Sequence, residues 1–194
     1  MTKVSWKPGN MLYPLPVIMA TVGNETENNI ITVAWTGTLC SDPPVTYIAV
    51  RPSRYSHGLL KKYGCFVINL TTERLARATD FCGVRSGRDV DKWALCKLTR
   101  EPAHHVETPM IAESPVNLEC AIRSVQQLGT HDVFTADIVN VNVDPRYMDH
   151  SGKFHLDRAR PIVYSHGTYY RTGTPVGGFG FSVRKKNNKR KRRR

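Results

Sequence analysis

Short runs of β-branched and aromatic residues, closely spaced along the chain, limit the folds that this sequence can adopt. They span residues 17–22, 30–35, 45–50, 65–70, 117–125 and 132–143. Runs of this length and composition, separated by polar or proline-rich turns, favour strands over helices. In residues 132–143 every second residue belongs to the same face of the strand, as in a half-buried sheet. The pattern therefore predicts a mainly antiparallel β protein.

Two longer segments, residues 53–64 and 71–83, have the start and stop signals of helices. Ser53 and Ser56 are candidate caps of the first, and it ends at Gly64, a good C-terminal stop. From residue 84 to 115 the chain reads as loops, with at most a short helix near Lys92. Because helices are few among six strands, we expect an all-β core, α+β overall, folded as a closed or partly closed barrel.

The positive charge is concentrated at the C-terminus. The formal net charge is +12, but residues 184–194 hold nine Lys or Arg and no acid, so about +3 remains for residues 1–183. Such a tail could bind nucleic acid, anionic lipid or an acidic redox partner, or serve solubility alone. A basic nucleic-acid-binding barrel is therefore one functional alternative. Neither stacking aromatic residues nor a DNA-reading helix accompanies the tail.

The cysteines exclude several classes of site. Their count of five is odd, and no CxxC pair occurs, which argues against a disulfide framework and against a zinc or iron–sulfur site. We therefore expect no metal and a reducing, cytoplasmic location. No signal peptide or membrane span is expected, because Pro14 and Pro16 interrupt the N-terminal apolar stretch. Cys40 could be a redox-active thiol, but a small buried hydrophobe is the favoured reading.

The stretch RPSRYSH, residues 51–57, carries the first specific functional signal. It places Ser53, Ser56, Arg51 and Arg54 at the expected start of a helix. A helix N-terminus with free N–H groups, hydroxyls and cations suits a phosphate group. The alternative is that both serines only cap the helix and both arginines are only solvated.

Several pieces of sequence occur in a fixed order within residues 11–172. They are PVIMATVG, NIITVAWTG followed by SDPPVTYIAVRPSRYSH, GCFVINL, SGRDVDKW, LGTHDVF and RPIVYSHGTYYRTG. Together they resemble the flavin reductase-like, FMN-binding split-barrel family. The resemblance implies a Greek-key split β-barrel that holds FMN. It divides the chain into a binding domain (1–172), a Gly-rich arm (173–183) and the basic tail (184–194), which lies outside the resemblance.

The resemblance also implies which residues contact FMN. For the phosphate and ribityl chain they are Thr36, Gly37, Thr38, Ser53, Arg54 and Ser56, and for the remaining contacts Asn29, Trp35, Lys92, His131 and Tyr164. Lys92 would act as a permanent charge near the ring, and His131 could change charge near pH 6.5. By themselves Asn29 could be a turn residue, Trp35 core and Lys92 a surface lysine.

The family resemblance implies electron transfer, and two roles stay open within it. One is an electron carrier between protein partners, which we favour, and the other is an NAD(P)H-dependent flavin reductase. No dinucleotide-binding fingerprint occurs in the chain, so NAD(P)H would have to dock against the flavin itself. The resemblance further implies a homodimer with the flavin near the subunit boundary.

Overall fold

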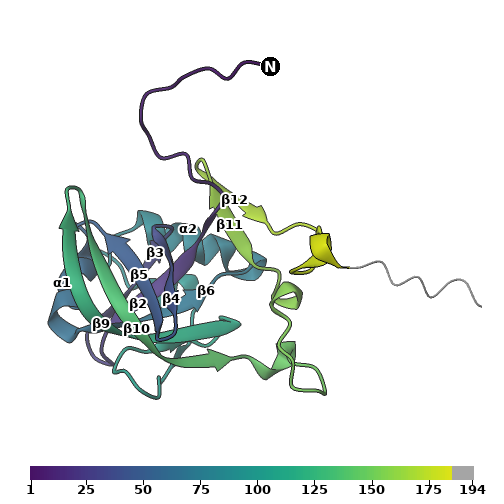
Figure 1. Ribbon diagram of the computed structural model, residues 1–194. Coiled ribbons are helices and arrows are strands. Elements are labelled where there is room, and N and C mark those ends of the chain that lie inside the picture. The colour runs from purple at the N-terminus through teal and green to yellow at the C-terminus, as the bar shows by residue number, and fades with distance from the viewer. Residues whose placement is uncertain (185–194) are drawn as a thin grey trace, which may run out of the picture.

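The structure is a computed structural model and describes residues 1–184 (Figure 1). The predicted basic tail therefore lies, apart from Arg184, outside the described residues. The Gly-rich arm, 173–183, contains one 3₁₀ turn, Phe181–Val183, and otherwise has no regular structure. None of the helices within residues 1–184 is long and apolar enough to cross a membrane.

A large antiparallel sheet forms the centre of the molecule. Its strands are β2 (Ile18–Gly23), β3 (Asn28–Val33), β4 (Thr36–Ser41), β5 (Pro44–Val50), β6 (Cys65–Leu70), β9 (Val116–Leu128) and β10 (His131–Val143). Within the described residues these seven strands pair in the order β3-β2-β6-β9-β10-β5-β4. Each predicted run is a strand, so the expected all-β core with a few short helices is confirmed.

Thr36, Gly37 and Thr38, for which the resemblance implies contacts with FMN, begin strand β4. It pairs with β5 in register Thr36↔Ile48, as the edge strand of the sheet. The Thr36 hydroxyl donates to the Tyr47 carbonyl across 2.6 Å, and the Thr46 hydroxyl donates to the Gly37 carbonyl across 2.9 Å. The small polar residues here stabilise the β4–β5 hairpin through these hydrogen bonds.

The first helix, α1 (Tyr55–Tyr63), begins after Arg54, and no side chain caps it. The expectation that Ser53 and Ser56 are caps is therefore wrong. Gly64 ends the helix with φ 67°, as predicted, because glycine adopts this left-handed conformation without steric cost. The second predicted helix consists of a 3₁₀ turn, Glu73–Leu75, and α2 (Ala76–Val84). The short helix α3 (Lys92–Cys96) follows, and the Asp91 carboxylate accepts hydrogen bonds from its first amides.

Two apolar cores lie on opposite sides of β2 and β3. Ile18, Ala20 and Val22 face the larger core, to which α1 contributes Leu59 and Leu60. The alternate residues Met19 and Ile30 face the smaller core, where α2 and α3 add Leu75, Ala78, Cys82 and Trp93. Both faces of β2 are thus buried, which explains why its sequence is apolar without alternation.

A smaller sheet stands beside the N-terminal chain and projects from the large sheet (Figure 1). It contains β1 (Leu15–Pro16), β11 (Ile162–Ser165) and β12 (Thr168–Arg171). A two-stranded pair, β7 (Arg100–Glu101) and β8 (Met110–Ile111), completes the strands of the described residues. The sequence gives no clear strand signal for β1, β7, β8 and β12, because runs of two to four residues show too little periodicity, whereas Tyr164 was expected to end a strand and does lie in β11.

Candidate functional site

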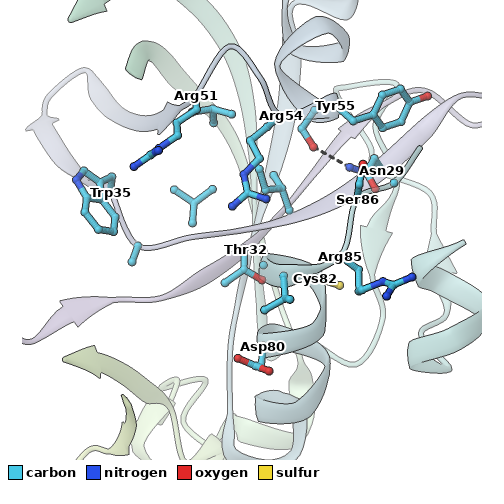
Figure 2. A pocket seen from close by; sticks show the side chains of 18 of the residues that line it. Asn29, Thr32, Trp35, Arg51, Arg54, Tyr55, Asp80, Cys82, Arg85 and Ser86 are labelled. Carbon is cyan, nitrogen blue, oxygen red and sulfur yellow. Dashed lines mark hydrogen bonds between the residues drawn. The ribbon is translucent and has the colours of Figure 1, made fainter. Parts of the chain in front are cut away.

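One cavity of about 750 Å³ lies where β3, the start of α1, the end of α2 and the β11–β12 hairpin meet. Its volume is within the range of small-molecule and cofactor sites. Figure 2 shows Arg51 and Arg54 on one wall, and Asp80 and Cys82 of α2 with the adjacent Arg85 on another. The cavity brings together segments that are far apart in sequence.

Most of the site residues predicted from the sequence line this cavity. They are Asn29, Trp35, Ser53, Arg54, Ser56, Lys92, His131 and Tyr164. Thr36, Gly37 and Thr38 do not line it, since strand β4 carries them along the sheet edge. The structure therefore separates the hydroxyls of β4 from those at the start of α1.

Cys40 is also outside the cavity. Its side chain is exposed, and its thiol donates to the Asp42 carbonyl across 3.3 Å. The expectation of a small buried hydrophobe is wrong, because β4 is an edge strand whose second half is exposed.

A buried polar contact marks the end of the cavity near α1. The side-chain amide of Asn29 donates to the Ser56 hydroxyl across 2.9 Å, and both residues are buried (Figure 2). Gly87 packs closely on the same amide: a Cβ added there would lie 2.2 Å from the Asn29 Oδ1 atom. Only glycine fits at this position, so the loop backbone approaches Asn29 directly. The contact holds Asn29 between β3, α1 and the loop after α2.

The cavity is strongly cationic. Four arginines line it, together with Lys92, against a single carboxylate, Asp80; the arginines are Arg51, Arg54, Arg85 and Arg88. Among the described residues none of these arginines forms an ion pair with an acid. Arg88 donates to the Ser53 carbonyl across 3.3 Å and lies over the ring of Tyr55. Such a charge balance suits an anionic ligand.

Lys92 is buried, with only 4% of its surface exposed, so the surface-lysine alternative is wrong. Its ammonium donates to the carbonyls of Ile30, at 2.6 Å, and Cys82, at 2.8 Å. Burial, aided by the positive charge of Arg54, lowers its pKa to about 8. The expectation of a permanent charge therefore needs correction, because Lys92 loses its proton in mildly alkaline solution. Lys92 joins β3 to α2 at the cavity wall.

Trp35 and His131 form a flat aromatic pair at another part of the cavity. Their rings are nearly parallel, at 7°, with centroids 6.0 Å apart. Trp35 stays 39% exposed, which excludes the alternative of plain core. Burial lowers the pKa of His131 below 6.5, and the positive charge of Arg51 lowers it further. The His131 imidazole is consequently mainly neutral at pH 7. It gains its charge at a lower pH than the sequence predicted.

The β11–β12 hairpin supplies a tyrosine-rich wall. Tyr164 and Tyr169 have ring centroids 5.6 Å apart, and Gly167 lies between them in the sequence. The Tyr169 hydroxyl donates to the Asp80 carboxylate across 3.3 Å. Burial, together with the negative charge of Asp80, raises the pKa of Tyr169 to about 12. Asp80 is thus engaged at this wall.

Sequence reasoning missed part of the cavity lining. The missed residues include Thr32, Tyr55, Asp80, Cys82, Arg85, Ser86, Gly87, Arg88 and Tyr169. A signal existed for the loop after α2, where Ser86 and Gly87 stand between two arginines, as is common where a backbone approaches an anion. For Asp80 and Cys82 the sequence contains no such signal, because both lie inside a predicted helix, where no ligand-binding motif occurs.

Fold and site together define an antiparallel β-barrel protein with a cationic cavity of cofactor size. The sequence profile of the "Flavin reductase like domain" matches residues 10–173 of the chain. The chain belongs to the flavin reductase-like family. This match confirms the resemblance inferred from the sequence pieces.

Similar proteins agree with this assignment. Flavoredoxin of Desulfovibrio vulgaris (Miyazaki F) superposes with a TM-score of 0.84 at 25% identity, covering 94% of this chain and 100% of that one. Flavoredoxin from Methanosarcina acetivorans gives a TM-score of 0.85 at 24% identity, over 95% and 100% of the two chains. An uncharacterized protein of Archaeoglobus fulgidus is 31% identical over 138 residues, 71% of this chain and 77% of its own. The split-barrel fold expected from the sequence is thereby confirmed.

Proposed function

We propose that this chain is an FMN-binding flavoprotein that works in electron transfer. The observation that carries the proposal is the cavity itself, which has a cationic, hydroxyl-bearing part at the start of α1 and an aromatic part at Trp35 and His131. Flavoredoxins are similar structures, and so is an FMN-binding protein from Thermus thermophilus, with a TM-score of 0.73 at 23% identity over 90% of this chain and 98% of that one.

The chemistry of the cavity residues fits the parts of FMN. Its phosphate carries about −1.5 to −2 charges. At the start of α1, Arg54 supplies a cation, and the hydroxyls of Ser53 and Ser56 supply hydrogen-bond donors. Asn29 keeps an amide oxygen and a second N–H for a polar partner. Trp35 offers a flat apolar face.

FMN would supply one- and two-electron redox chemistry, which belongs to the cofactor. The chain's own residues would hold it, orient it and exclude water. Gly87 would let the loop backbone approach the ligand beside Asn29, and Lys92 would keep β3 and α2 at a fixed spacing. His131, neutral at pH 7, would place no full charge beside Trp35.

We favour an electron carrier between protein partners over an NAD(P)H-dependent reductase. The chain carries no dinucleotide-binding fingerprint, and similarity to flavoredoxin over nearly the whole chain supports the carrier. The reductase predicts saturable consumption of NADH or NADPH by the purified protein, and the carrier predicts none. The expected result is a bound FMN that strong reductants reduce, without turnover of either nucleotide.

A visible absorption spectrum of the purified protein tests the central proposal. We expect flavin absorption bands, or their appearance as a protein-bound spectrum when FMN is added. A colourless protein that does not bind added FMN would contradict the proposal. Salt-sensitive binding of nucleic acid by such a colourless protein would favour the basic-barrel alternative.

We also propose a homodimer. Val139, Val141 and Val143 lie on one face of β10, and each remains more than a third exposed, at 41%, 52% and 38%. A row of exposed valines on a strand is costly in water and suits a second copy of the chain. Light scattering on the purified protein should give twice the mass of one chain, and a single-chain mass would exclude the dimer.

A further inference from the structure

Two cysteines, Cys82 of α2 and Cys96 of α3, lie together in the smaller core. Cys82 is a buried member of this core, and Cys96 packs against it from a partly exposed position. Helices α2 and α3 are in direct contact, and a hydrogen bond links the two thiols, with Cys82 as the donor. The tertiary structure thus forms a dithiol pair from cysteines that belong to no CxxC motif.

The pair crosses the wall of the cavity. Cys82 lines the cavity on the same side as Asp80 and Arg85 (Figure 2). Cys96 is not among the lining residues and stays partly exposed at the end of α3. One sulfur atom therefore lies beside the space proposed for the flavin, and the other lies toward solvent.

Lys92 fixes the pair and reduces the cost of its ionisation. Its ammonium donates to the Cys82 carbonyl across 2.8 Å, and Cys96 follows Lys92 one helical turn later on the same face of α3. Burial raises the pKa of Cys82 to about 12 and also raises that of Cys96, whereas the positive charge of Lys92 acts on both thiols in the opposite direction. Burial opposes a thiolate but not a disulfide, because a disulfide carries no charge.

We propose that Cys82 and Cys96 form a reversible disulfide that exchanges two electrons with the flavin in the cavity. This inference rests on the proposed FMN binding. Disulfides in a reducing compartment are usually transient ones of this kind. The pair would give the electron carrier a second redox centre between the flavin and the surface.

The exchange balances in both directions. Reduction of the disulfide breaks the S–S bond and forms two S–H bonds, which requires two electrons and two protons. Reduced flavin supplies both electrons and one proton, and solvent supplies the second proton through Cys96. In the other direction an external disulfide compound reacts with the Cys96 thiolate, Cys82 then displaces it from Cys96, and the compound leaves as two thiols.

The other cysteines, all within the described residues, form no such pair. Cys65 and Cys120 belong to the neighbouring strands β6 and β9, but Cys65 pairs with Ala121, so the two side chains point to opposite faces of the sheet. Cys65 shares a hydrogen bond of 3.3 Å with the Thr108 hydroxyl, which a serine could keep. Cys65→Ser is therefore a matched control for Cys96→Ser. Cys40 is exposed and is removed by Cys40→Ser in every protein tested.

Thiol alkylation and mass spectrometry test the disulfide on the FMN-free protein after incubation with oxidised glutathione. We expect one peptide pair joined through Cys82 and Cys96, which dithiothreitol separates. Cys96→Ser should fold, because the side chain is partly exposed, and should give no joined peptides. Cys65→Ser should give the same joined pair as its parent. Full alkylation of both thiols after oxidation would overturn the proposal.

Anaerobic reduction by dithionite tests the exchange on the FMN-loaded protein in its disulfide form. It should take up about four electrons per chain, two for FMN and two for the disulfide, and Cys96→Ser should take up about two. The disulfide should be reduced at least about tenfold faster with FMN bound than without it.

Equal rates of disulfide reduction with and without FMN, or uptake of the same number of electrons by the parent and Cys96→Ser, would overturn the exchange while FMN binding stands. A protein that does not bind FMN would overturn the proposed function and the exchange together, and its visible spectrum distinguishes this outcome from failure of the cysteine pair alone.

Discussion

The side-chain amide of Asn29 donates a hydrogen bond of 2.9 Å to the hydroxyl of Ser56, and the contact joins β3 to the first turn of α1. Both side chains are buried, so water cannot readily replace either hydrogen-bond partner if the contact is broken. The contact fixes the spacing between the strand that ends beside Trp35 and the helix start beside Arg54. The cavity depends on this spacing.

Ser56→Ala should lower both stability and FMN affinity. The substitution leaves one N–H of the buried Asn29 amide without its partner, at a cost of about 1 kcal/mol in the free energy of unfolding. FMN affinity should fall about tenfold, because the Asn29 amide loses its fixed orientation. Urea unfolding and an FMN titration measure the two effects. Unchanged values for both would show that the contact has no role in the site.

Gly87→Ala should weaken FMN binding more than it weakens the fold. The new methyl group would lie 2.2 Å from Asn29 Oδ1, so the amide or the loop has to move. We expect an FMN affinity at least about tenfold lower, measured by fluorescence titration.

The control for this substitution is Gly58→Ala in α1, where an added Cβ meets no atom within 4 Å. Alanine there should stabilise the protein by about 0.5–1 kcal/mol, because glycine is a poor helix former. FMN binding should stay the same. Similar FMN affinities in the two variants would refute the close-approach argument for Gly87.

Lys92→Met should change how stability depends on pH. The folded pKa of Lys92 is about 8, lowered by burial from 10.5. Between these values the unfolded chain binds more protons at Lys92 than the folded chain does, so the lysine's contribution to stability rises with pH. Below pH 8 both states are charged, and the folded state bears the full cost of burying the ammonium. The wild type should gain on the order of 3 kcal/mol relative to the variant across this window.

Urea unfolding of both apoproteins at several pH values from about 8 to 10.5, the folded and unfolded pKa of Lys92, measures this difference. The other titrating groups affect the unfolding free energies of both proteins equally, so their contribution cancels when the two values are subtracted. A constant difference would mean that the Lys92 pKa is not lowered in the folded state.

His131 should titrate below pH 6.5, and Arg51→Gln should raise its pKa. Burial is the larger cause of the shift, so the substitution should restore only part of it. Proton NMR of the imidazole signals gives the pKa in each variant. A pKa in Arg51→Gln equal to that of the wild type would place the guanidinium away from the Trp35–His131 pair.

Cys40 should react first with a thiol reagent. Its side chain is exposed, whereas burial raises the pKa of Cys82 and of Cys120 to about 12 and suppresses their thiolate forms. Cys40→Ser should remove the fastest phase of the reaction with Ellman's reagent. FMN affinity should not change, because Cys40 lies outside the cavity. A loss of FMN on modification of Cys40 would show that this thiol contributes to FMN binding.

Local patterns in the sequence were sufficient to predict the strands and the main helices. Alternation in residues 132–143 and the stop at Gly64 both hold in the structure. The stretch RPSRYSH was placed correctly at the start of a helix, which follows from its own residues. These features are local, since propensity and period act over a few neighbouring residues.

Which residues share the cavity was decided only by the tertiary structure. The hydroxyls of Thr36 and Thr38 resemble those of Ser53 and Ser56 in sequence, yet pairing with β5 carries them away along a sheet edge. Burial of Lys92 and the approach of Gly87 to Asn29 depend on how α2, α3 and the loop between them pack against β3. Such contacts join residues tens of positions apart, and burial alone shifts a lysine pKa, so no short stretch of sequence records them.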